Sequence, residues 1–377
     1  MTQATDSDSA LLQPWSGPYG GVPPWHLVRP DEFVDAFKAA IELAKAENDE
    51  IANQTAPATF ENTLKRMETA GLPLQRLIAI YGVHSSNLKV GPMPEIERVV
   101  MPMLAEYDDS RTQNEKLFKR IEAVYEGDEM QQLSPAEQRI VDDTYKSFVR
   151  QGAKLNAEDK QRLSNINKRL AGLFADFSQN VLDDEQGYVT WIDDESQLAG
   201  LPDSVRAAMA AAAEERADDK GVAGKWAVTN TRSSMEPFLT YADSRDLREK
   251  VWRNYYGRGD NGDSHDNNGI ITTILGLRAA RAKLLGYDTH AHWRLEPQMA
   301  KTPEAAMDLM MRVWPKAVAR VKEEVADMQR IADEEGAGMT IEPWDYRYYA
   351  EKVRKAKYDL DFNEVKPYMQ LEKLREA

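Results

Sequence analysis

Apolar side chains recur every three or four residues along most of the chain, which is the spacing of one face of an α-helix. This periodicity predicts helices over residues 31–54, 74–88, 95–125, 203–217, 243–256, 270–285 and 302–335. A further helix is predicted after Asn156, with a buried stripe at Leu163, Ile166, Leu170, Leu173, Phe174 and Phe177. We therefore expect an almost all-α protein.

Two further helices are predicted from residues that mark the start of a helix. Thr59 is suited to the cap position, where its hydroxyl can accept from a free backbone N–H group. Ser134 and Glu137 form a capping box around Pro135, which is favoured at a first helical position. These residues predict helices that begin just after position 59 and at position 135, the second continuing to about position 150.

The helical pattern is interrupted by two short segments in which apolar and polar residues alternate. These are YVTWID at residues 188–193 and KWAVTN at residues 225–230, and both are rich in residues that favour strands. We expect at most a small β-hairpin or short sheet near residues 186–230.

The two ends of the chain have different patterns. Residues 1–22 are polar and then rich in Gly and Pro, which predicts a mobile tail leading into an extended segment. Residues 23–377 are expected to form the helical lobe or lobes. Near the other end, Pro343 is expected in the first turn of a helix with apolar positions at Tyr349, Val353, Ala356 and Leu360. A last helix is expected after Pro367, with apolar positions at Met369, Leu371 and Leu374.

Composition narrows the class of protein. The 377 residues are 42% hydrophobic and 29% charged, which is typical of a globular protein rather than a disordered one. A net charge of −15 argues against a nucleic-acid partner, because binding to phosphates depends on clustered Lys and Arg. There are no cysteines, so disulfides and thiolate metal sites are excluded.

Location is predicted from two patterns that the sequence does not show. No run of about 18 apolar residues is present, so no membrane-spanning helix is expected. The first residues lack the basic and apolar regions of a signal peptide, which predicts the cytoplasm. A periplasmic location is the alternative if a signal peptide had been removed.

The histidines do not form a common zinc-binding pattern. In H-E-x-x-H, two imidazoles four residues apart project from one helix face, and the glutamate activates a metal-bound water. None of the five histidines has another four residues further on; they are His26, His84, His265, His290 and His292. His290 and His292 lie close to Asp288, but in a helical segment their side chains point apart and are interpreted as packing residues.

Four other groups are weighed as sites and given structural interpretations. Asp260, Asp263 and Asp266 could suggest calcium, but their spacing does not fit an EF-hand loop and indicates a solvated turn. The G-x-G-x-x-G string at residues 257–262 follows a helix instead of a strand, so it is not a dinucleotide-binding fingerprint. The aromatic group could line a peptide groove but is expected in the core. The arginine group could face a substrate carboxylate but is expected to be solvated or in structural ion pairs. These groups are Trp344, Tyr348 and Tyr349, and Arg232, Arg253 and Arg258. No catalytic, cofactor-binding or metal-binding residue is assigned.

Long blocks of the sequence resemble one family. The run PWDYRYYAEKVRKAKYDLDFNEVKPYMQLEKLREA at residues 343–377 is similar to a segment that precedes the catalytic half of the thimet oligopeptidase and peptidyl-dipeptidase family of zinc metallopeptidases. PATFENT, FSQNVL, YADSRDLREKVWRNY and LRAARAKLLGYDTHAHWRLEPQMAKTPEAAM agree with that family in the same order. The resemblance covers the chain from about Leu11 and is closest to the bacterial peptidyl-dipeptidase branch.

The resemblance implies a function that this chain would perform only in part. It implies a large multi-helix lobe of a zinc oligopeptidase fold that forms a wall of a deep channel admitting short peptides. In the intact family enzyme, zinc and a glutamate activate the water that attacks the peptide bond. Because H-E-x-x-H is absent, the catalytic zinc segment is expected after residue 377, and the chain is expected to bind no zinc and to be inactive alone.

Two further expectations follow from this interpretation. The missing C-terminal catalytic half would be the partner of this chain, and without it exposed apolar faces are expected to cause self-association or marginal stability. The alternative function is a non-enzymatic helical scaffold that binds peptides.

Overall fold

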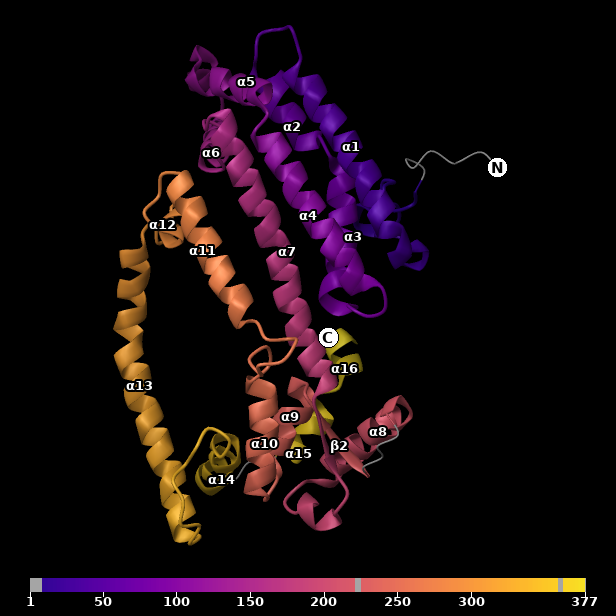
Figure 1. Cartoon of the computed structure of the whole chain (residues 1–377), viewed down its shortest axis with the longest axis vertical. Coiled ribbons are helices and arrows are strands. Elements are labelled where there is room, and N and C mark those ends of the chain that lie inside the picture. Colours follow the sequence, from indigo (N-terminus) through magenta and orange to yellow (C-terminus); the bar gives the residue numbers. More distant parts are fainter. Residues whose placement is uncertain (1–8, 221–224, 359–361, 377) are drawn as a thin grey trace. The chain divides into compact units, whose positions relative to one another are not determined.

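A computed structural model describes residues 9–220, 225–358 and 362–376 and confirms the almost all-α fold (Figure 1). The chain divides into two compact units. The first unit comprises Met1–Gln179 and Gly269–Pro303, and the second comprises Asn180–Asn268 and Glu304–Ala377. Each unit is described separately.

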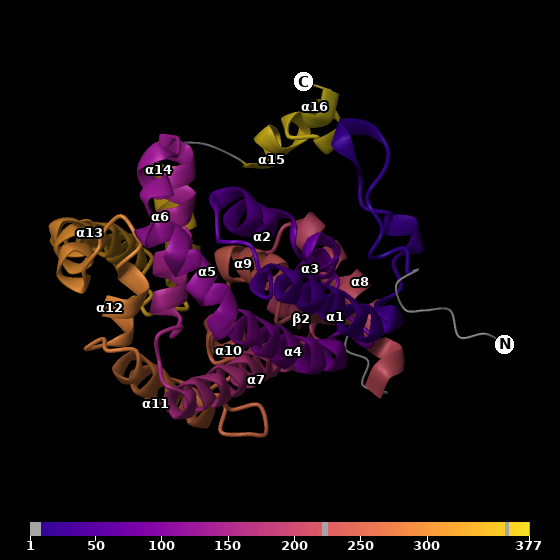
Figure 2. The ribbon, with the colours of Figure 1, turned by 90° about the horizontal axis from the view of Figure 1, so that it is seen from above.

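The first unit is built from helices. They are α1 (Phe33–Ala52), α2 (Lys65–Thr69), α3 (Leu72–Asn87), α4 (Met93–Thr112), α5 (Glu115–Glu126), α6 (Pro135–Arg150), α11 (Asn268–Leu284) and α12 (His290–Leu295). The long helix α7 (Ala157–Gly187) contributes its first part to this unit. Helix α1 packs against α3 and α4, as the view from above shows (Figure 2).

The apolar face of α1 forms the centre of one core. Phe33 and Phe37 are fully buried and lie four residues apart, so both project from the same side of the helix. Tyr81 of α3 meets both rings edge-on, at 5.5 Å and 5.2 Å between ring centres, which is a favourable arrangement for aromatic pairs. Leu11 and Leu12, which precede the first helix, are buried in the same core.

The predicted helix starts in this unit are confirmed, but one predicted helix is divided. Ser134 and Glu137 form the capping box at α6, and Thr59 accepts from the backbone N–H of Asn62 at the start of a short π-type turn. The predicted helix over residues 95–125 was wrong as a single element. Asn114 breaks it, because its side chain accepts from two free N–H groups and so begins α5.

The second unit combines a two-stranded sheet with helices. Strands β1 (Val189–Ile192) and β2 (Trp226–Thr229) pair antiparallel, with Val189 opposite Thr229, which confirms the predicted short sheet. The helices are α8 (Asp203–Lys220), α9 (Arg232–Tyr241), α10 (Arg245–Tyr256), α13 (Pro303–Glu334), α14 (Tyr346–Tyr358), α15 (Phe362–Val365) and α16 (Leu371–Glu376). Helix α9 packs against β2, α10 and α14, and it was not predicted from the sequence.

Three sequence expectations differ from the structure or fall outside it. Phe174 was predicted to be buried but is 38% exposed, with the guanidinium of Arg278 5.2 Å from its ring centre. Pro343 precedes the first turn of α14, which begins at Tyr346. Leu360 lies outside the described residues.

Several apolar side chains of the second unit are exposed in the described structure. Tyr368, Met369, Leu371 and Leu374 are between 64% and 81% exposed at the end of the chain. Trp314 on α13 is 63% exposed. None of the described helices is both long enough and apolar enough to span a membrane.

Candidate functional site

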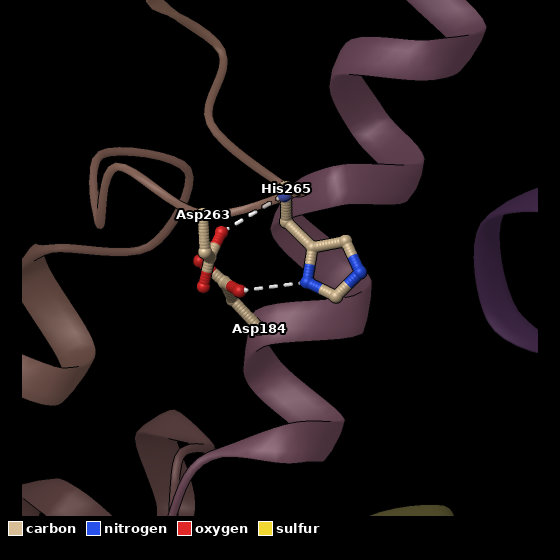
Figure 3. Close-up of side chains that lie close together, drawn as sticks. All are labelled: Asp184, Asp263 and His265. Atoms are coloured by element: carbon tan, nitrogen blue, oxygen red, sulfur yellow. Dashed lines mark hydrogen bonds and ion pairs between the residues drawn. The ribbon is translucent and has the colours of Figure 1, made fainter.

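The second unit brings three potential metal ligands together. Asp184 lies near the end of α7, whereas Asp263 and His265 belong to the loop between α10 and α11 (Figure 3). One ligand atom from each residue lies within 4.8 Å of the other two. In the sequence, Asp263 was weighed only as part of a calcium loop and His265 only as one of five histidines without H-E-x-x-H spacing, and Asp184 was not singled out.

Asp184 anchors the loop through both of its oxygen atoms. Its side chain is fully buried, and Oδ2 accepts hydrogen bonds from the backbone N–H of Gly259 at 2.7 Å and from the amide of Asn261 at 2.8 Å. Oδ1 lies 3.2 Å from Nδ1 of His265 (Figure 3). A buried carboxylate needs such partners, because an unpaired one is costly to remove from water.

Asp263 is exposed and shapes the turn around His265. Its Oδ1 accepts from the backbone N–H of His265 at 2.9 Å, and its Oδ2 accepts from the hydroxyl of Tyr188 at 3.1 Å. The hydrogen bond from the His265 backbone is the main cause that holds the pKa of Asp263 below its ordinary value. The carboxylate is therefore ionised at neutral pH.

The chemistry of these three ligands suits a divalent transition metal, which accepts carboxylate oxygen and imidazole nitrogen. Their hydrogen bonds favour another role. The oxygens of Asp184 and Asp263 all face protein donors, so a cation would have to displace at least the contact between Asp184 and His265. As it stands, the arrangement holds the loop against α7.

The other residues of this loop also serve its turns. The side chain of Asn268 donates to Asp260 at 2.7 Å, and the backbone N–H of Gly262 donates to Asp266 at 3.0 Å. Gly259 has a φ of 71°, and a Cβ atom there would lie 2.7 Å from the amide nitrogen of Asn267. Gly262 also has a positive φ, of 68°, so backbone geometry favours glycine at these two positions of the string. Asp263 and Asp266 thus accept from backbone N–H groups of the loop, as expected for a turn, whereas Asp260 accepts from the side chain of the first residue of α11.

The remaining histidines lie in the first unit and do not form a ligand cluster within the described ranges. His84 packs edge-on against Phe33, with 5.4 Å between ring centres. Nδ1 of His292 lies 2.8 Å from the hydroxyl of Thr289, which caps α12. His26 lies in a short 3₁₀ turn. His290 is half-buried, and its surroundings are described further below.

The arginines weighed as substrate contacts have the structural pairings that we expected. Each has a carboxylate partner: Arg232 pairs with Glu236 at 2.9 Å, Arg253 with Glu249 at 2.7 Å, and Arg258 with Glu185 at 2.5 Å. The aromatic residues are also involved in packing. Tyr349 is buried, and the hydroxyl of Tyr348 donates to Asp243 at 2.8 Å. The ring centre of Trp344 lies 5.0 Å from the guanidinium carbon of Arg253.

One buried cluster had no sequence signal. Asp345, which is fully buried, accepts from Arg248 at 2.8 Å and from Arg245 at 2.9 Å. The Arg248 guanidinium also stacks 4.2 Å from the ring centre of Tyr348. These contacts join α10 to the start of α14. The sequence shows the residues but not their proximity, because nearly 100 positions separate the two segments.

Comparison with known proteins identifies similar sequences. The sequence profile of peptidase family M3 matches residues 238–376. A dipeptidyl carboxypeptidase from Salmonella typhimurium is 32% identical over 365 residues, which is 97% of this chain and 53% of the relative. Oligopeptidase A from Escherichia coli is 30% identical over 352 residues, which is 92% of this chain and 51% of the relative. The chain therefore spans about half the length of these curated relatives.

Proposed function

Because this chain belongs to peptidase family M3, we propose that it forms a channel-lining helical part of a peptidase that acts on short peptides. The peptidase would be of the dipeptidyl carboxypeptidase or oligopeptidase type. The observation that carries this proposal is the similarity to a dipeptidyl carboxypeptidase along 97% of the chain. The almost all-α fold agrees with the multi-helix lobe that the resemblance implies.

A catalytic zinc does not fit the residues of this chain. The sequence has no H-E-x-x-H, so no helix offers two imidazoles on one face beside a glutamate. The potential ligand cluster in the described residues contains one imidazole, that of His265, and its carboxylate oxygens are already hydrogen-bonded. We therefore propose that residues 1–377 do not hydrolyse peptides alone and act with a partner segment that carries the zinc ligands.

Exposed apolar side chains support a surface for such a partner. Met369, Leu371 and Leu374 are 78%, 64% and 75% exposed, and large apolar side chains gathered at one end of a chain mark an interaction surface. In the proposed function, the partner segment covers them. The cytoplasmic location remains a prediction.

The experiment that tests this proposal measures zinc and hydrolysis together. Zinc content of the purified 377-residue chain is determined by mass spectrometry, and cleavage of a quenched short peptide is followed with and without added zinc. We expect no stoichiometric zinc and no turnover. One zinc per chain together with cleavage would overturn the proposal and place the ligands among the five histidines and the carboxylates.

A binding experiment distinguishes the alternative function. A fluorescent short peptide is titrated into the chain in the presence of a chelator, so that it is not cleaved. The comparison is a titration of this fluorescent peptide into a folded control protein of similar charge. Saturable binding without zinc and without cleavage would favour a peptide-binding scaffold. Binding that appears only after the partner segment is added would favour a channel that both segments complete.

A further inference from the structure

Two arginines and a histidine lie around Trp293 in the first unit, and a third arginine, Arg278, acts electrostatically on Arg281 and His290. Arg278 and Arg281 lie on α11, whereas His290, Trp293 and Arg294 lie on α12. The guanidinium carbons of Arg281 and Arg294 are 4.5 Å and 5.7 Å from the ring centre of Trp293. The ring centre of His290 is 5.5 Å from that of Trp293. We call these five residues the arginine cluster.

The arginine cluster lacks the carboxylate partners that many other arginines in this acidic protein have. Nearby Arg150, for comparison, pairs with Glu296 at 2.7 Å. Within the described parts of the chain, no carboxylate lies within ion-pairing distance of Arg278, Arg281 or Arg294. Three positive charges therefore repel one another in a protein whose net charge is −15.

Several hydrogen-bonding atoms of the cluster are buried and unpaired. Nε of Arg278, Nε of Arg281 and Nδ1 of His290 have no hydrogen-bond partner among the described residues. Burial of such atoms without partners is unfavourable. Burial, followed by the charges of the three arginines, lowers the pKa of His290 to about 4. The imidazole is therefore neutral at pH 7, while its surroundings are strongly positive.

Packing explains the positions of the arginines but not their unpaired atoms. Nη1 of Arg281 donates to the side-chain oxygen of Asn167 at 3.0 Å, and Arg278 stacks over Phe174. Asp109 acts on Arg281 electrostatically, but its Oδ1 accepts from Asn167 at 2.7 Å rather than from an arginine. These contacts hold the side chains in place and leave their Nε–H groups unsatisfied.

We propose that the arginine cluster binds an oxyanion, the phosphate or carboxylate group of a small ligand. Guanidinium groups donate several charge-assisted hydrogen bonds, and their geometry matches the oxygen atoms of phosphates and carboxylates. A bound oxyanion supplies acceptors for the buried N–H groups and offsets the repulsion between the arginines. The site is separate from the proposed role in peptide hydrolysis, and its test involves no peptide.

Calorimetric titration of the full chain tests the site with two probes, inorganic phosphate and malonate, at constant ionic strength with chloride as background. We expect saturable binding of one ion of at least one probe per chain. Binding of phosphate alone would assign a phosphate-bearing ligand, and binding of malonate alone would assign a carboxylate-bearing one. Absence of binding by both probes, or an equal response to added chloride, would overturn the proposal.

Nuclear magnetic resonance places the bound ion. Because a nearby anion favours the charged imidazolium, the pKa of His290 should rise above about 4 when the probe is added. The signal of His84, which packs in a different core, serves as the internal control. Binding without any change at His290 would show that the ion sits elsewhere and would overturn the proposal.

Variants connect the binding to the named side chains. The double variant Arg278→Gln with Arg294→Gln keeps the contact between Arg281 and Asn167, and it should weaken binding about tenfold or more. Arg312→Gln removes one exposed positive charge on α13 and is the matched control, with binding unchanged. If the double variant does not fold, Arg294→Gln alone, at an exposed position, should weaken binding at least about threefold. Unchanged affinity in the folded cluster variants would overturn the proposal.

Discussion

Asp345 and Arg248 form a buried ion pair, with 2.8 Å between Oδ1 and Nη2, although they lie 97 positions apart in the chain. Their side chains are 0% and 2% exposed. Arg245 adds further hydrogen bonds to the same carboxylate. This contact joins the segment just before α14 to α10 in the second unit.

Removal of the carboxylate should destabilise the second unit strongly. Asp345→Ala leaves the Arg248 guanidinium buried without its partner, and loss of one member of a buried pair costs about 3–5 kcal/mol. Urea denaturation of the variant and the parent measures the difference. Asp327→Ala is the control, because Asp327 pairs with Lys357 at the surface, and its loss should destabilise the chain much less than the loss of Asp345. Equal losses in the two variants would contradict the prediction.

The same pair should give stability that depends on acidic pH. Burial alone would raise the pKa of Asp345, but hydrogen bonds from Arg245 and Arg248 outweigh it and hold the pKa below its ordinary value. The contribution to stability is therefore complete above the unfolded-state pKa of about 3.9, and it is lost as the pH falls through the lower pKa of the folded state. Denaturation of the parent and of Asp345→Asn from pH 7 to pH 2 should show their difference shrinking below about pH 4. A constant difference would contradict this assignment.

Two glycines of the loop between α10 and α11 should differ in their response to alanine. Gly259 and Gly262 both have positive φ, so each substitution costs about 1–2 kcal/mol of backbone strain. At Gly259 the new Cβ would also collide with the amide of Asn267, whereas at Gly262 it meets no atom within 4 Å. Gly259→Ala should therefore be the more destabilising by thermal unfolding. Equal effects would mean that the loop relaxes to accommodate the Cβ atom.

The cluster of Asp184, Asp263 and His265 should act as a loop anchor that needs no metal. We expect a chelator to leave the unfolding temperature of the chain unchanged. Asp184→Ala should speed amide hydrogen exchange in residues 257–268, because it removes the acceptor for Gly259 and Asn261. Saturable binding of Zn²⁺ or Mn²⁺ by the parent but not by Asp184→Ala would instead establish a metal site.

The exposed apolar end of the chain should cause self-association. Leu371→Glu with Leu374→Glu should shift the chain toward monomer in sedimentation velocity, because these side chains are 64% and 75% exposed. Lys373→Glu, on the same short helix, is the control for added negative charge and should change the distribution less. A parent chain that is already monomeric at high concentration would rule out this surface as a self-association site.

Helix positions could be predicted because their signals are local. The Ser134 capping box and the alternating strand segments depend on residues within a few positions of one another, and both predictions are confirmed. Errors arose where a local signal competed with periodicity. Asn114 interrupts an otherwise helical pattern. Phe174 continues an apolar stripe but is partly exposed to solvent, with the guanidinium of Arg278 lying over its ring.

The candidate site could be predicted only in part. Asp263 attracts attention in the sequence because it lies in a polar loop with Asp260 and Asp266, and its interpretation as a turn residue agrees with its hydrogen bond from the backbone of His265. Asp184 is one acidic residue among many along a long helix. Its burial and its bond to Gly259, 75 positions away, appear only when the loop folds back onto α7.

The sequence by itself determined the almost all-α class, most helix boundaries and the short antiparallel sheet. It also showed the resemblance to a peptidase family and the absence of H-E-x-x-H from this chain. These features depend on periodicity, caps and motifs, which are properties of neighbouring residues. Tertiary structure alone decided that Asp345 meets Arg248, that Asp184 anchors a loop and that Arg281 and Arg294 lie beside the same tryptophan. Such pairings depend on the path of the chain, which brings together residues that are far apart in the sequence. They also depend on burial, which strengthens the interactions between their charges.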